Sequence, residues 1–219
     1  MELINISKTY KDTVFKNINY KFEKGIVYSI FGKNGIGKTT ILNIISGFIL
    51  SDTGEIKYNI NEENIVFISE NPIPFDLLTG KEFVIATMKF KGIKCCEKET
   101  DNLFKEFEID SFKDNIISTY SKGMKYKLLI IIMTLMKPQV LILDEPFIDL
   151  DLITLEKVRT IFCKLKMDSI IIFSTHIPNI AFKLSDKILF LKNDKLIDQD
   201  NNFNNSGEID SYVFNLMSK

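Results

Sequence analysis

The sequence contains few of the residues from which metal, redox and nucleic-acid sites are usually built. Its 219 residues include no tryptophan, one histidine, one arginine (Arg159) and only three cysteines. Cys95 and Cys96 are adjacent and Cys163 stands alone, a spacing that predicts neither a disulfide framework nor a zinc site. The formal net charge is −1, so the chain lacks the basic field that attracts nucleic acid, and we expect no nucleic-acid partner.

We also expect no signal peptide and no membrane-spanning segment. The residues from Met1 to Asn5 include an acid and soon become polar, unlike a signal peptide. The most apolar run, Leu128 to Met136, ends at Lys137-Pro138, well short of the roughly twenty residues that cross a bilayer. Since 45% of the residues are hydrophobic, we expect one globular domain. Since no signal peptide is visible, we expect this domain in the cytoplasm.

A glycine-rich loop is the most informative motif that is present, and it fits the pattern G-x-x-x-x-G-K-[ST]. Its residues are Gly32, Lys33, Asn34, Gly35, Ile36, Gly37, Lys38 and Thr39. The β-branched and aromatic run at 26–31 predicts a strand before the loop, and the run at 40–45 predicts a helix after it. A glycine-rich turn that matches by chance is the alternative, but the flanking strand and helix favour a phosphate-binding P-loop.

The residues of this loop suit the binding of a nucleoside triphosphate with Mg²⁺. Gly35 and Gly37 allow the backbone to fold around an anion, and the N-terminus of the following helix attracts the same anion. We expect Lys38 to reach the β- and γ-phosphates and Thr39 to offer its hydroxyl to Mg²⁺. Thr40, which begins the helix, belongs to the same predicted phosphate site.

Two adjacent acids follow a second predicted strand. The continuous apolar run at 140–143 is typical of a parallel strand covered on both faces, and it ends at Asp144 and Glu145. Ligands of open α/β sheets bind at the carboxyl ends of the strands. Asp144 is therefore expected to support the Mg²⁺ ion, and Glu145 to polarise a water aimed at the γ-phosphate. The alternative is a pair of helix-capping acids, since Pro146 follows closely.

The chain's one histidine also stands at the end of a predicted buried strand. His176 follows the apolar run at 169–175. A lone histidine is often a packed structural residue, and this alternative stays open. The position nevertheless favours a functional role, in which His176 bonds a γ-phosphate oxygen or orients the catalytic carboxylate of Glu145.

Together these motifs resemble, in order and over nearly the whole chain, the nucleotide-binding subunit of ABC (ATP-binding cassette) transporters. Four further segments match the family. Tyr10 resembles the aromatic residue that stacks on adenine, and Ser69-Glu70-Asn71 resembles the Q-loop. The segment 120–124 resembles the signature motif, and Leu150-Asp151 resembles the D-loop. The resemblance implies a second nucleotide-binding subunit packed head to tail against the first. Each ATP would then lie between the P-loop of one subunit and Ser121 and Gly123 of the other, with Glu70 and Asp144 near the Mg²⁺ ion.

The chain departs from the family pattern at several positions. Glu70 stands where the family usually has glutamine, which would bring a negative charge close to a triphosphate. The signature has Tyr120, Lys122 and Met124 in place of leucine, glycine and glutamine. This variant resembles subunits of exporters for peptides, antibiotics or cell-envelope components, an analogy within the family rather than a physical argument.

The expected architecture is a single α/β domain over residues 1–219, with a RecA-like P-loop NTPase core and a mostly parallel sheet. Alternating patterns predict a small antiparallel β subdomain at about 1–25 and 50–70, and helical patterns predict a helical lobe at about 75–127. The remainder forms the core, including a hairpin turn at Asn193-Asp194 and a helix at 209–217.

The sequence thus predicts an enzyme that hydrolyses ATP with Mg²⁺ and powers a separate integral membrane permease, with export favoured. Such a subunit would lie on the inner face of the membrane through that partner. A non-transport ABC ATPase that acts as an ATP-gated regulatory module is the first alternative. A generic P-loop enzyme such as a small-molecule kinase is the second, although the signature at Ser121 disfavours it. The cargo, and the choice between a homodimer and a pair with a related cassette, stay open.

Overall fold

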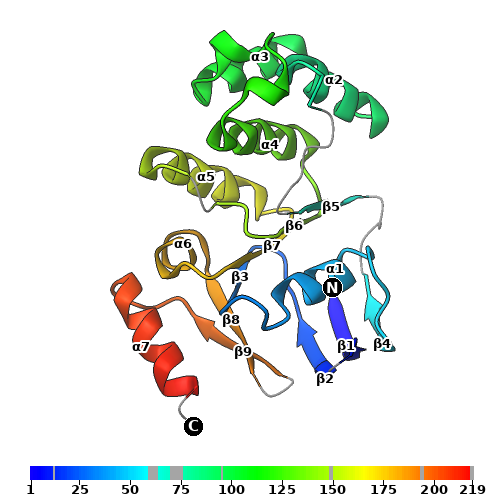
Figure 1. Ribbon diagram of the computed structural model, residues 1–219, viewed down its shortest axis with the longest axis vertical. Helices are drawn as coiled ribbons and strands as arrows, with labels where there is room; N and C mark the ends of the chain where they lie inside the picture. Colours follow the sequence, from blue (N-terminus) through cyan, green and yellow to red (C-terminus); the bar gives the residue numbers. More distant parts are fainter. Residues whose placement is uncertain are drawn as a thin grey trace. The chain divides into compact units, whose positions relative to one another are not determined.

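The computed structural model describes the chain except residues 12, 59–63, 70–75, 95, 148–149, 193–194 and 218–219. It consists of two compact units, which are described separately here and are both drawn in Figure 1. The sheet unit comprises Met1–Glu70, Gln139–Pro146 and Phe162–Lys219, and the helical unit comprises Asn71–Pro138 and Phe147–Ile161.

A six-stranded sheet forms the centre of the sheet unit, in the order β5-β6-β7-β3-β8-β9. Its strands are β3 (Val27–Phe31), β5 (Ile65–Ile68), β6 (Val140–Leu143), β7 (Ile170–Thr175), β8 (Lys187–Lys192) and β9 (Lys195–Asp200). All neighbouring pairs are parallel except β8 with β9. Every residue of β3, β6 and β7 is buried, as expected of parallel strands covered on both faces. The predicted mostly parallel α/β core is confirmed.

Strand β5 differs from its expected position. Residues 50–70 were predicted to belong to the antiparallel subdomain, but β5 pairs in parallel with β6, Ile65 lying opposite Val140. That part of the prediction was wrong because Ile-Val-Phe-Ile is a continuous apolar run, which suits a strand inside a parallel sheet better than a half-exposed antiparallel strand.

A small antiparallel sheet accompanies the central one. It has the order β2-β1-β4, formed by β1 (Glu2–Thr9), β2 (Thr13–Lys21) and β4 (Thr53–Lys57). Its buried side chains Leu3, Ile6 and Ile18 belong to one hydrophobic core with Ile30 of β3 and Ile172 of β7. The predicted antiparallel subdomain is therefore present and shares a core with the parallel sheet.

Among the residues that the structure describes, three helices lie entirely within the sheet unit: α1 (Lys38–Ile45), α6 (Pro178–Leu184) and α7 (Ser206–Met217). Helix α7, expected at 209–217, begins slightly earlier and buries Ile209 in a second core with Phe31 and Phe190. The hairpin turn predicted at Asn193-Asp194 lies outside the described residues, but the strands on either side pair antiparallel, with Lys192 opposite Lys195.

The helical unit contains α2 (Gly80–Phe90), α3 (Glu97–Glu106), α4 (Lys122–Met136) and the first part of α5 (Leu152–Leu165). The boundary predicted near residue 127 falls inside α4, which continues to Met136 because no glycine or proline lies between residue 127 and Pro138. Lys137 ends the helix in a left-handed conformation. Among the residues described, no helix has the length and hydropathy that a membrane crossing requires.

Candidate functional site

The glycine-rich loop joins the carboxyl end of β3 to the N-terminus of α1, as predicted. Gly35 and Gly37 have φ angles of 82° and 106°, and Gly37 is the N-cap of α1. A Cβ atom added at Gly37 would lie 2.8 Å from Val14 Cγ1 and 3.2 Å from Leu191 Cδ2. Both the backbone conformation and the close approach of these neighbours therefore require glycine at this position.

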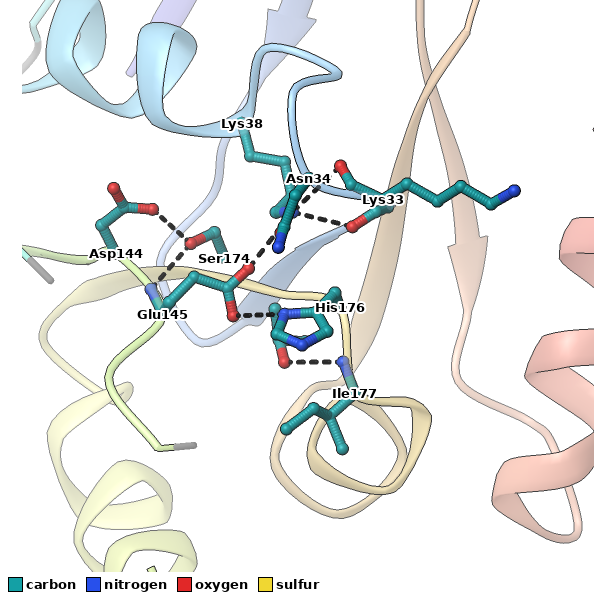
Figure 2. Close-up of polar contacts among 10 residues, drawn as sticks. Lys33, Asn34, Lys38, Asp144, Glu145, Ser174, His176 and Ile177 are labelled. Atoms are coloured by element: carbon teal, nitrogen blue, oxygen red, sulfur yellow. Dashed lines mark hydrogen bonds and ion pairs between the residues drawn. The ribbon is translucent and has the colours of Figure 1, made fainter. Parts of the chain in front are cut away.

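Lys38 lies inside the curve of this loop with only 5% of its side chain exposed. Its ammonium donates hydrogen bonds to the carbonyl oxygens of Gly32, at 2.7 Å, and Lys33, at 3.2 Å, and to Asn34 Oδ1, at 3.5 Å. Figure 2 shows these contacts, with the Lys33 side chain directed away from the cluster. The buried ammonium is therefore placed to form charge-assisted hydrogen bonds with an anion bound by the loop.

Glu145 brings a buried carboxylate between Lys38 and His176 (Figure 2). Its Oε1 lies 3.1 Å from Lys38 Nζ, and its Oε2 lies 3.1 Å from His176 Nδ1. The three N–H groups of Lys38 already have acceptors, and Oε1 accepts no hydrogen bond within the part of the chain that is described. This oxygen is therefore an acceptor with spare capacity, held beside a cation.

Ser174 joins the two adjacent acids. Its hydroxyl donates to Asp144 Oδ1 at 2.6 Å and accepts from the backbone N–H of Glu145 at 2.8 Å. Ser174 is not among the site residues predicted from the sequence. A signal was available, because Ser174 is a polar residue in a buried strand and lies two positions before His176 in the sequence.

The side chains predicted to hold Mg²⁺ suit such an ion. Asp144 is 3% exposed and offers carboxylate oxygens, and the exposed Thr39 offers a hydroxyl in the first turn of α1. No group of three or more acidic, histidine or cysteine side chains is gathered as a metal cage in the described part of the chain. Mg²⁺ typically uses one or two protein ligands together with phosphate oxygens and water. Glu70, the third predicted ligand, lies outside the described residues.

Tyr10 follows strand β1, and 59% of it is exposed. The Lys8 ammonium lies 5.5 Å from the centre of the Tyr10 ring and is itself paired with Asp52 Oδ1 at 2.8 Å. The exposed ring offers a face on which a flat base can stack.

The predicted signature residues lie at the start of α4 in the helical unit. Ser121 is the N-cap, and its hydroxyl accepts from the Met124 N–H at 3.2 Å. Gly123 occupies the first turn, so both residues belong to a helix N-terminus, which favours anions. Tyr120 is structural: it is buried, its hydroxyl donates to the Phe112 carbonyl at 2.7 Å, and burial raises the pKa of Tyr120 to about 12.

Asp151 of the predicted D-loop caps helix α5. Its carboxylate accepts from the Thr154 N–H and from the Thr154 hydroxyl, each at 2.8 Å. These hydrogen bonds lower the pKa of Asp151 below its ordinary value.

Comparison with known proteins identifies the class to which this fold and site belong. The family model "ABC transporter" matches residues 15–148. Human ATP-binding cassette sub-family A member 10 is 36% identical over 202 residues, which cover 86% of this chain and 13% of that protein. An uncharacterised ABC transporter ATP-binding protein of Methanocaldococcus jannaschii is 31% identical over 200 residues, covering 88% of this chain and 74% of the relative.

A solved structure gives the same assignment. The structure of an ATP-binding subunit of an ABC transporter has a TM-score of 0.81 with this chain at 25% identity, over 91% of this chain and 89% of that one. The chain therefore belongs to the ABC transporter family, and the predicted ABC-family ATPase domain is confirmed. It spans about 13% of the length of the human relatives that it matches.

Proposed function

We propose that this chain hydrolyses ATP to power a separate integral membrane permease, and that the transport is export. The observation that carries this proposal is the meeting of Lys38, Glu145 and His176 at one edge of the parallel sheet. The family assignment supports the transport context, and the variant signature at Tyr120 to Met124 supports export. The domain would lie on the cytoplasmic side of the membrane through its partner.

In the proposed reaction, Lys38 binds the β- and γ-phosphates, and Tyr10 stacks on the adenine. Glu145 accepts a proton from a water whose oxygen bonds to the γ-phosphorus. The bond from that phosphorus to the β–γ bridging oxygen breaks, which releases phosphate and leaves ADP. Thr39 and Asp144 would hold Mg²⁺, which neutralises charge on the phosphate oxygens when bound.

His176 has the proposed role of sensing the γ-phosphate. A protonated ring can donate from Nδ1 to Glu145, the contact seen at 3.1 Å, and from Nε2 to a phosphate oxygen. Replacing His176 by alanine is expected to lower kcat about 100-fold with little change in ATP affinity. Phosphate release and calorimetry measure the two quantities. Asparagine at this position, which keeps an N–H near Nδ1, should retain more activity, and normal turnover of the alanine variant would remove the role.

The second half of the proposed site is supplied by another subunit, through Ser121 and Gly123. The placement of these two residues at a helix N-terminus supports a contact with the γ-phosphate of ATP bound to the partner. Because ADP lacks that phosphate, the dimer should form with ATP and weaken after hydrolysis.

Light scattering after size exclusion tests this dimer with the Glu145→Gln variant, which should hold ATP without turnover. The mass is expected to double from 25.3 kDa only when Mg²⁺ and ATP are present. Adding Ser121→Glu should keep the variant monomeric because its carboxylate would repel the phosphate. Ser118→Glu, an exposed change in the same unit, should not. A monomer that still binds ATP would contradict a homodimer and favour a pair with a related cassette.

A further inference from the structure

We propose that Ser174 is a positioning residue for ATP hydrolysis, which fixes the geometry of Asp144 and Glu145 together. This inference rests on the roles proposed above for the two acids. It adds a residue that belongs to none of the motifs found in the sequence.

The hydroxyl of Ser174 acts both as a hydrogen-bond donor and as a hydrogen-bond acceptor. The side chain is completely buried at the carboxyl end of β7, where it donates to Asp144 Oδ1 at 2.6 Å and accepts from the Glu145 N–H at 2.8 Å. One atom therefore orients the carboxylate of one acid and the backbone of the next (Figure 2). Because the peptide unit between the acids is planar, fixing its N–H also restricts the direction in which each side chain leaves the backbone.

The backbone of Glu145 has an unfavourable conformation that surrounding contacts must stabilise. Its φ angle is 46°, in the left-handed region that a residue with a Cβ adopts only at a cost in free energy. Such conformations persist when surrounding contacts determine them, and the hydrogen bond from the Glu145 N–H to Ser174 is one of these contacts. In this conformation the carboxylate reaches both Lys38 Nζ and His176 Nδ1.

The sheet register explains why Ser174 can reach both acids. Strands β6 and β7 are parallel neighbours with Leu143 opposite Phe173, so the residues that follow this pair, Asp144 and Ser174, are neighbours too. His176 lies two residues further along the same chain segment. Strand β7 therefore sets the position of Asp144, Glu145 and His176 relative to one another.

The test compares Ser174→Thr with Ser174→Val, which have the same shape and differ in the hydroxyl. Valine leaves a buried carboxylate oxygen and a buried N–H without their partner, whereas threonine retains it. We expect valine to lower kcat about 30-fold or more while the KM for ATP changes less than about threefold, and threonine to restore kcat to within about threefold of the parent. In Ser174→Val, the Asp144 carboxylate is no longer held in one orientation, so it should contribute less to Mg²⁺ binding. Calorimetry with ADP, with and without Mg²⁺, should therefore show that Mg²⁺ increases ADP affinity less in Ser174→Val than in the parent.

Ser29→Ala provides the matched structural control. Ser29 is also fully buried in the same sheet, on β3, and its hydroxyl bonds that of Ser185 at 3.0 Å, away from the two acids. This variant should lose thermal stability to a similar degree but keep the parent kcat. If Ser174→Val shows the parent kcat, or if threonine and valine lose kcat equally, the inference is overturned. If neither folds, Ser174→Ala decides by the same kcat criterion against Ser29→Ala.

Measuring Glu145→Gln in parallel separates this inference from the proposed function. Normal turnover by Glu145→Gln would remove Glu145 from the role of base, whatever Ser174 does. Loss of turnover in Glu145→Gln together with the parent kcat in Ser174→Val would leave the proposed function intact and overturn the role of Ser174.

Discussion

Replacing Glu145 by glutamine should lower ATP turnover by about 10³-fold while ATP still binds. Glutamine has nearly the same shape and fits between Lys38 and His176, but its amide cannot accept a proton from the attacking water. The carboxylate charge beside Lys38 is also lost, so the ammonium becomes more available to phosphate oxygens and affinity should not fall. Phosphate release gives the turnover, and calorimetry with ATP and Mg²⁺ gives the affinity.

Glu55→Gln is the matched control for this change. Glu55 lies on β4, and 64% of its side chain is exposed, so the same chemical change there should leave both turnover and affinity as in the parent. Turnover of Glu145→Gln within a few-fold of the parent would show that another group accepts the proton. Loss of ATP binding in the same variant would show that the carboxylate serves the binding site rather than the chemical step.

Replacing Lys38 by alanine should weaken ATP binding by at least about 100-fold, since each charge-assisted hydrogen bond to a phosphate oxygen contributes about 1.5–3 kcal/mol. The change also leaves the buried Glu145 carboxylate without its cation at 3.1 Å, which adds repulsion against a triphosphate. Titration calorimetry with ATP and Mg²⁺ measures the affinity, and circular dichroism checks that the variant is folded.

Lys33→Ala, in the same loop, is the control for loss of one positive charge. The Lys33 side chain is exposed and directed away from the cluster, and the residue contributes its backbone carbonyl to Lys38. Its removal should change ATP affinity less than about threefold, as expected of a screened surface charge. If Lys38→Ala also binds ATP with nearly the parent affinity, Lys38 does not bind the phosphates as proposed.

The features around the candidate site that the sequence could indicate are backbone conformations and strands with local signals. Gly35 and Gly37 indicate left-handed backbone, and the continuous apolar runs before Asp144 and His176 indicate buried parallel strands with these polar residues at their carboxyl ends. These signals depend only on neighbouring residues. Because the carboxyl ends of parallel strands lie at the same edge of a sheet, these strands also predict that Lys38, Glu145 and His176 lie close together.

The parts that sequence could not give depend on contacts between distant segments. Ser174 acts through a strand partner rather than through a motif, and the left-handed φ of Glu145 has no signal in a residue type that rarely adopts it. Strand β5 was assigned to the wrong sheet although its continuous apolar run suits a parallel strand, because its pairing with the distant strand β6 leaves no local signal in the sequence.

The P-loop strand β3 lies between β7 and β8, both of which come from the last quarter of the chain. Pairing such distant segments is entropically costly and slow, so the loop acquires its supported conformation late in folding. During synthesis, a chain that has not yet produced β7 and β8 carries the whole P-loop sequence but not the sheet that supports it. Nucleotide binding should therefore select fully folded molecules, and cellular ATP would protect the finished sheet unit from unfolding without rescuing incomplete chains.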